Sequence, residues 1–253
     1  MVDAALSPAM SADRLAPLVV LVHGAWHGAW CWAAVQARLD ARGIASLAID
    51  LPGHGASTLP LTDLHGDAQH VADVIDHWGR DVVLVGHSYG GAVITEAAVR
   101  TGRGRHLVYL AAFAPNQGEG IMGVLGSLPR HDVALGAAMQ MRDDGSSVLD
   151  ADLAVPALYG ACSREVASAA IVRLSPQPMV TFGQPVTGDP RSSIDSTYVV
   201  CTLDQAIHPE HQWAMSERCG TVLTLETDHS PFASTPDATA DLIEAVVARV
   251  EHT

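Results

Sequence analysis

The segment covering residues 82–92, VVLVGHSYGGA, constrains the fold of this chain more than any other. Its four aliphatic residues predict a buried strand, and the alanine- and valine-rich stretch after the glycines predicts a helix. Between them lies the pattern G-x-S-x-G, in which Gly86 and Gly90 flank Ser88 where a Cβ would collide with a sharply strained turn. A further glycine, Gly91, lets the new helix pack close to the strand that it leaves. A strand that breaks into a helix in this way presents one serine, which indicates a nucleophile elbow.

The length and charge of the chain limit the classes of protein to which it can belong. Its 253 residues, 48% of them hydrophobic, suffice for one substantial core but are short for two independent domains, so we expect a single domain over residues 1–253. The formal net charge is -14, from 14 Lys and Arg against 28 Asp and Glu. This charge argues against nucleic acid or an anionic membrane as a partner.

The cysteines and the N-terminal segment indicate the compartment. Cys31, Cys162, Cys201 and Cys219 have no C-x-x-C spacing, which predicts ordinary buried thiols and neither a zinc ribbon nor a disulfide framework. The first sixteen residues lack a basic start and a long apolar run, so we expect a mobile tail and not a signal peptide. No stretch approaches the roughly 20 uninterrupted apolar residues that span a bilayer. We therefore expect a cytoplasmic protein.

From Leu18 onward, short aliphatic runs alternate with longer helical patterns. This alternation predicts an α/β fold, in which helical crossovers join the strands into a mostly parallel sheet with helices on both faces. The predicted strands cover residues 18–22, 44–49, 82–85, 106–111, 197–201 and 221–225. Because these runs are almost continuously apolar, we expect both of their faces to be covered. Helical spacing predicts helices over residues 30–41 and 64–78, and an amphipathic helix closes the chain after Pro236.

One long interval, residues 114–187, interrupts the alternation. It is too long for a simple connection and too apolar for a disordered linker, so we interpret it as an inserted helical cap on a core of residues 17–113 and 188–253. Such a cap would cover Ser88. An exposed apolar edge of the cap could also support a homodimer.

An acid must accompany the serine. A serine hydroxyl is a poor nucleophile at neutral pH, so it needs a histidine to take its proton and an acid to orient that histidine. On a parallel sheet these groups gather at the carboxyl ends of the strands, in the chain order serine, acid, histidine. Asp204 fits because it lies in the turn directly after the predicted strand 197–201. Asp195 precedes that strand, and Asp228 adjoins the best histidine candidate, where neighbouring side chains diverge.

Among the 13 histidines, His229 best fits the base because it follows the predicted strand 221–225 and precedes the closing helix. His208 and His211 form an H-x-x-H pair, but no third ligand is evident, so we interpret them as a solvated helix start and expect no metal. His54 and His87 are interpreted as structural hydrogen-bonding residues.

Attack by Ser88 on a carbonyl would create an oxyanion, which needs two hydrogen-bond donors. The backbone N–H of Tyr89, at the start of the helix, supplies one. The other should come from the loop after an earlier strand, and His23-Gly24 ends the first strand in a turn that exposes the next amide. We therefore predict that Ala25 N–H is the second donor.

The chain resembles the α/β-hydrolase superfamily. Within it, the chain is similar to the group of small methylesterases and hydroxynitrile lyases known best from plants, which has bacterial esterase relatives. The motifs that carry the resemblance are LVHGAWHGAWCW at residues 21–32, DLPGHG at 50–55, the elbow, YLAAF at 109–113 and DHSPF at 228–232. The resemblance implies a catalytic triad of Ser88, Asp204 and His229 and an oxyanion hole of Ala25 and Tyr89. It also implies that Gly24, Phe113 and Ser230 line the substrate pocket.

Two departures from the lyases bear on the reaction. Lyases of this group carry Thr or Asn at the position of Gly24, and one type carries Lys at the position of Ser230. The cap is the least similar part, with Ala161 where relatives often have Asp. The resemblance therefore favours a serine carboxylic ester hydrolase that cleaves a small, largely apolar ester through an acyl-enzyme, without a metal or an organic cofactor. The alternatives are a cyanohydrin lyase that uses the serine as a base, and a non-catalytic receptor for a small molecule.

Overall fold

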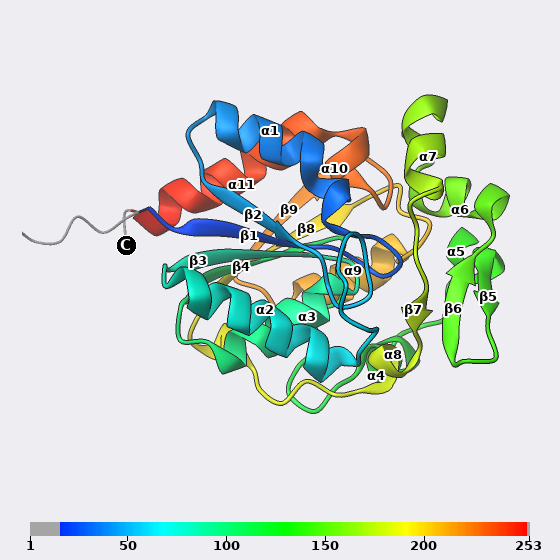
Figure 1. Ribbon diagram of the computed structural model, residues 1–253, viewed down its shortest axis with the longest axis horizontal. Coiled ribbons are helices and arrows are strands. Elements are labelled where there is room, and N and C mark those ends of the chain that lie inside the picture. Colours follow the sequence, from blue (N-terminus) through cyan, green and yellow to red (C-terminus); the bar gives the residue numbers. More distant parts are fainter. Residues whose placement is uncertain (1–15, 252–253) are drawn as a thin grey trace, which may run out of the picture.

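The computed structural model of the protein describes residues 16–251, so the prediction of a mobile N-terminal tail falls outside the described residues, apart from Ala16. Six parallel strands form the central sheet in the order β2-β1-β3-β4-β8-β9 (Figure 1). They are β1 (Leu18–Val22), β2 (Ser46–Ile49), β3 (Val82–His87), β4 (Gly104–Leu110), β8 (Asp195–Cys201) and β9 (Thr221–Leu225). All six predicted strands are confirmed, with shifts of up to two residues at their ends.

Helices cover both faces of the sheet, as expected (Figure 1). One face is covered by α2 (Leu64–Trp78) and α3 (Gly90–Arg100), and the other by α1 (Ala33–Ala41) and α11 (Pro236–Glu251). The predicted helix 30–41 is divided, because its first turn is a 3-10 helix, η1 (Ala29–Trp32). Successive strand residues point to opposite faces, so Val20 packs under α2 and α3 while Val19 packs under α1 and α11.

The expectation that every strand is covered on both faces was wrong for the edge strand β9. The residues of β1 and β3 are all buried, whereas β2 is mostly half-buried and β9 alternates between half-buried and exposed residues. An edge strand has a neighbouring strand on one side only. Its side chains therefore have fewer neighbours and are more exposed to solvent. Aliphatic composition alone does not distinguish these two positions.

The segment predicted as a cap connects β4 to β8 along the chain. In space it lies at the end of the sheet where the parallel strands finish (Figure 1). Its helices are α4 (Ile121–Ser127), α5 (Ala134–Ala138), α6 (Ala151–Leu158), α7 (Arg164–Ile171) and α8 (Val180–Gly183). It also carries an antiparallel sheet of β5 (Met139–Met141), β6 (Ser146–Leu149) and β7 (Gln177–Pro178), which the sequence analysis did not predict. We call residues 114–187 the cap segment.

The remaining elements follow the cap segment. They are the 3-10 helix η2 (Pro190–Ser192), α9 (Pro209–Ser216) and α10 (Pro231–Ser234). Within residues 16–251, no helix combines the length and the apolar character that crossing a membrane requires.

Candidate active site

Ser88 lies on the turn between β3 and α3 with a φ of 53°, in the left-handed region that non-glycine residues rarely adopt. A Cβ on Gly86 would lie 2.5 Å from the carbonyl oxygen of Gly90, and a Cβ on Gly90 would lie 2.7 Å from backbone oxygens at the end of β1. Both positions therefore require glycine. A Cβ on Gly91 would collide with the carbonyl oxygen of Phe113, so this glycine allows contact with the chain after β4 and not, as predicted, with β3.

Asp204 and His229 are in direct contact. Nδ1 of His229 lies 2.7 Å from Oδ2 of Asp204, and both side chains are buried. The other carboxylate oxygen accepts hydrogen bonds from the N–H groups of Ala206, at 2.6 Å, and Ile207, at 2.9 Å. Nε2 of Gln212, on α9, donates to Oδ2 of Asp204 at 2.8 Å. Sequence reasoning did not identify Gln212; its only sequence signal is a place on the helix that follows the acid.

The loop of His229 is joined to the elbow through His87. Nε2 of His87 donates to the carbonyl oxygen of His229 at 2.7 Å, and the two ring centroids lie 4.6 Å apart. Burial is the main cause that lowers the pKa of His87 well below its usual range, so the ring is neutral. His87 therefore has the structural role that the sequence suggested. It places the imidazole of His229 beside the residue that precedes Ser88.

The predicted oxyanion donors both belong to segments that adjoin the serine. A Cβ on Gly24 would lie 2.8 Å from the Cβ of Ser88, so the loop after β1 contacts the nucleophile turn directly. Within the described part of the chain, the N–H groups of Ala25 and Tyr89 donate no hydrogen bond to another backbone group. Both amides are thus free to bind an external acceptor.

The direction of Ala25 N–H is fixed by the other side of its peptide group. The carbonyl oxygen of Gly24 accepts hydrogen bonds from Nδ1 of His23 at 2.8 Å and from the N–H of His27 at 3.3 Å. Nε2 of His23 in turn accepts from the N–H of Leu51 at 3.1 Å. Because a trans peptide is planar, its N–H points away from the side on which its carbonyl is bound. Burial lowers the pKa of His23, which keeps it neutral with one donor and one acceptor nitrogen.

Two further predicted pocket residues lie close to these groups. The N–H of Phe113 donates to the carbonyl oxygen of Ser88 at 3.1 Å, and the Phe113 side chain belongs to the core under α2 and α3. Ser230 is fully buried, and its N–H donates to Asp228 at 3.1 Å.

In the described structure, neither Asp228 nor Asp195 forms a hydrogen bond with the imidazole of His229. Asp195 begins β8, at the opposite end of that strand from Asp204. Asp228 accepts hydrogen bonds from Ala161 N–H and from Ser234 Oγ, both at 2.8 Å. It thereby ties the cap segment to the loop of His229.

The histidine pair at α9 differs from its sequence interpretation. His208 is the N-cap of α9, but His211 is buried, and its Nε2 donates to the carbonyl oxygen of Pro129 at 2.6 Å, so it is not solvated. The structure also brings His131 against His208, and with Glu210 their ligand atoms lie within 4.8 Å of one another. The rings of His131 and His208 stack with centroids 4.0 Å apart and 7° between their planes. In-plane lone pairs of parallel stacked rings do not converge on one ion, which argues against one metal ion bound by both rings.

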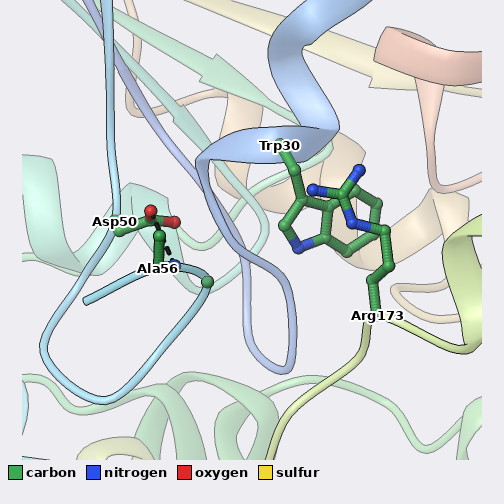
Figure 2. A pocket seen from close by; sticks show the side chains of 5 residues that line it. Trp30, Asp50, Ala56 and Arg173 are labelled. Atoms are coloured by element: carbon green, nitrogen blue, oxygen red, sulfur yellow. Dashed lines mark hydrogen bonds between the residues drawn. The ribbon is translucent and has the colours of Figure 1, made fainter. Parts of the chain in front are cut away.

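A separate cleft lies where the cap segment meets the core and is lined by Trp30, Asp50, Gly55, Ala56 and Arg173 (Figure 2). The guanidinium carbon of Arg173, from the cap segment, lies 4.6 Å from the ring centroid of Trp30. Asp50 accepts hydrogen bonds from the N–H groups of Ala29 and Ala56. None of the predicted site residues lines this cleft. The contact between Arg173 and Trp30 joins the cap segment to the core.

A mostly parallel sheet with a strained serine turn after a central strand is the architecture of α/β hydrolases. The model of the alpha/beta hydrolase family matches residues 19–242, and the chain belongs to this family. It is 31% identical over 245 residues to the alpha/beta hydrolase nvfD of Aspergillus novofumigatus, covering 90% of this chain and 96% of the relative. It is 27% identical over 245 residues to methylesterase 17 of Arabidopsis thaliana, covering 88% and 89%.

Among solved structures, the pyrethroid hydrolase of Sphingobium faniae superimposes with a TM-score of 0.81 at 25% identity, covering 92% of this chain and 97% of that one. These similarities identify the protein as an ester hydrolase that resembles the methylesterases. The family and fold implied by the sequence motifs are thus confirmed.

Proposed function

We propose that the protein is a serine carboxylesterase whose triad is Ser88, Asp204 and His229 and whose oxyanion hole is formed by the N–H groups of Ala25 and Tyr89. The observation that carries this proposal is the hydrogen bond between Asp204 and His229 beside the strained turn of Ser88. Asp204 occupies Nδ1 of the imidazole, which leaves Nε2 as the nitrogen available to the serine hydroxyl.

The reaction begins when Ser88 Oγ forms a bond with the ester carbonyl carbon while its proton passes to Nε2 of His229. The carbonyl oxygen becomes an oxyanion that accepts hydrogen bonds from Ala25 and Tyr89. As the tetrahedral intermediate collapses, the bond to the leaving oxygen breaks and His229 returns the proton to the alcohol. Water then repeats the sequence on the acyl-enzyme, and His229 accepts its proton, so that the acid is released and Ser88 regains its hydroxyl.

The surroundings of Ser88 favour hydrolysis over cyanohydrin cleavage. No side chain fits at Gly24 without displacing Ser88 or His87, because a Cβ there would lie 2.8 Å from each. The Thr or Asn that lyases of this group carry at that position is therefore incompatible with the present backbone. The position of Ser230 also lacks a lysine ammonium group that could bind cyanide.

The substrate that we propose is a small, largely apolar ester. Ser88 is only 8% exposed, and the neighbouring Ala25 and Tyr89 are buried, which suits an ester with little charge. Relatives named for methyl ester and pyrethroid hydrolysis support this class.

Substitution of the serine tests the mechanism. We expect purified wild-type protein to hydrolyse short-chain aryl and methyl esters and to be labelled covalently by a serine-directed organophosphate, whereas Ser88→Ala should do neither. A panel that varies the acyl and the alcohol parts separately then defines the substrate. Hydrolysis by Ser88→Ala at the wild-type rate would contradict the proposal. Release of cyanide from an aromatic cyanohydrin faster than any ester is cleaved would favour the lyase instead.

A further inference from the structure

We propose that Tyr159 of the cap segment is a positioning residue that holds the Ala25 donor of the oxyanion hole in place through His27. This inference rests on the proposed function, because it assumes that Ala25 N–H binds the oxyanion. It assigns to the cap segment a part in the chemical step.

The first link runs from the cap segment to His27. The hydroxyl group of Tyr159 lies 2.7 Å from Nε2 of His27, and both side chains are buried. Nδ1 of His27 lies 2.8 Å from the carbonyl oxygen of Ala25, to which only an N–H can donate. Nε2 must then be the acceptor, and Tyr159 the donor. Burial is the main cause that lowers the pKa of His27 to about 4, so the ring is neutral at pH 7.

The second link runs from His27 to the oxyanion donor. His27 bonds two successive peptide groups, since its ring donates to the carbonyl oxygen of Ala25 and its N–H donates to that of Gly24. The carbonyl group of Gly24 shares a peptide plane with the N–H of Ala25. A rotation of His27 therefore turns the very N–H that would bind the oxyanion.

The loop also has a strained backbone that the cap segment helps to hold. Trp26, between Ala25 and His27, has a φ of 63°, which is rare for so large a side chain. Its Nε1 donates to Oγ of Ser147 on β6 at 3.1 Å, and its carbonyl oxygen accepts from the N–H of Ser175 at 2.8 Å. Both partners belong to the cap segment. A strained conformation persists only where its surroundings determine it, and here the cap segment supplies both of these bonds.

The test compares Tyr159→Phe, which removes only the hydroxyl group, with Tyr109→Phe. Tyr109 is an equally buried tyrosine whose hydroxyl group bonds Thr95, away from this loop. With 4-nitrophenyl butyrate, we expect Tyr159→Phe to lower kcat by about 10-fold or more with little change in KM, since small misplacement of a catalytic group is costly. Tyr109→Phe should keep kcat within about twofold of wild type.

A transition-state probe separates positioning from a general loss of structure. In 1,1,1-trifluoroheptan-2-one, Ser88 Oγ adds to the carbonyl carbon, the proton passes to His229 and the carbonyl oxygen becomes an oxyanion. The Ki of this ketone should rise in Tyr159→Phe by about the same factor as kcat/KM falls. The Ki of the corresponding secondary alcohol, which forms no oxyanion, should not change. Equal weakening of both inhibitors would overturn the inference, because it would indicate a damaged pocket.

A double-mutant cycle tests whether Tyr159 acts through His27. The side-chain amide of His27→Asn can still donate to Ala25 but offers nothing at the position of Nε2. We expect Tyr159→Phe to have no further effect on kcat in that background. Additive effects would overturn the inference. Ser88→Ala, assayed in parallel, distinguishes the two failures: if it is inactive while Tyr159→Phe has normal kcat, only the positioning role fails, and if it is active, the proposed function fails as well.

Discussion

Nδ1 of His229 lies 2.7 Å from Oδ2 of Asp204, although the two residues are 25 positions apart in the sequence. Each follows the carboxyl end of a strand, and because β8 and β9 are parallel neighbours, their following loops meet at one edge of the sheet. The adjacent Asp228 is engaged elsewhere, by Ala161 and Ser234.

This pairing predicts different results for two aspartate substitutions. Asp204→Asn should lower kcat by about 10,000-fold, because an amide can donate to Nδ1 and thereby stabilise the wrong tautomer of His229. Asp228→Asn should reduce kcat far less and should mainly lower the melting temperature, since it weakens bonds to the cap segment. Steady-state kinetics and thermal denaturation of both variants provide the measurement. A larger loss of kcat in Asp228→Asn would show that the acid is misassigned.

The close packing around Gly24 predicts that no side chain is tolerated at this position. In Gly24→Ala, the new Cβ would lie 2.8 Å from the Cβ of Ser88 and from Nδ1 of His87, so one of them must move. Overpacking of this kind costs about 1–3 kcal/mol of stability. Displacement of the nucleophile by about 1 Å should lower kcat by about 100-fold. Gly102→Ala is the matched control, because its Cβ meets no atom within 4 Å and its φ is not positive; if the two variants had equal kcat, Gly24 would have no steric role.

Gln212 predicts that α9 supports the acid. Its side chain donates to Asp204 and to the carbonyl oxygen of Ile207, and it accepts from the N–H of Cys201, all in the buried interior. Gln212→Leu removes these bonds at similar size and should cost about 1–3 kcal/mol of unfolding free energy. It should also lower kcat, by less than Asp204→Asn does. Urea denaturation and kinetics test this, with exposed Gln69→Leu as the control; unchanged stability in Gln212→Leu would be the contrary result.

Buried histidines predict a loss of stability in mild acid. Burial is the main cause that lowers the pKa of both His27 and His106 from 6.5 to about 4. Between pH 6.5 and pH 4 these histidines bind protons in the unfolded chain but not in the native protein. Acid therefore favours unfolding. Each residue should remove up to about 3 kcal/mol between pH 6.5 and pH 4.

His106 is suited to measuring this effect because it lies on β4, bonded to Thr197 and away from the candidate active site. Urea denaturation between pH 7 and pH 4.5 should show a shallower fall in unfolding free energy for His106→Gln than for wild type. The exposed residue His77 gives the control His77→Gln, which should keep the wild-type slope. Identical slopes in all three proteins would indicate that His106 is charged in the native state.

The sequence alone predicted the parallel sheet, its six strands and the family. It could do so because aliphatic runs, glycine spacing and helix-start signals are local properties that each segment carries by itself. The strained turn at Ser88 is the sharpest case, since only glycine fits at Gly86 and Gly90. Because the predicted strands are parallel, the sequence also indicated that the loops of Asp204 and His229 lie at the same edge of the sheet.

Only the tertiary structure decided which side chains support the site. The bonds from Gln212 to Asp204 and from Tyr159 to His27 join separate segments, and no spacing in the sequence marks them. The same holds for the small sheet of the cap segment and for the contact between His131 and His208. Local patterns determine where a strand or a nucleophile turn forms, whereas hydrogen bonds between distant segments depend on how the whole chain packs.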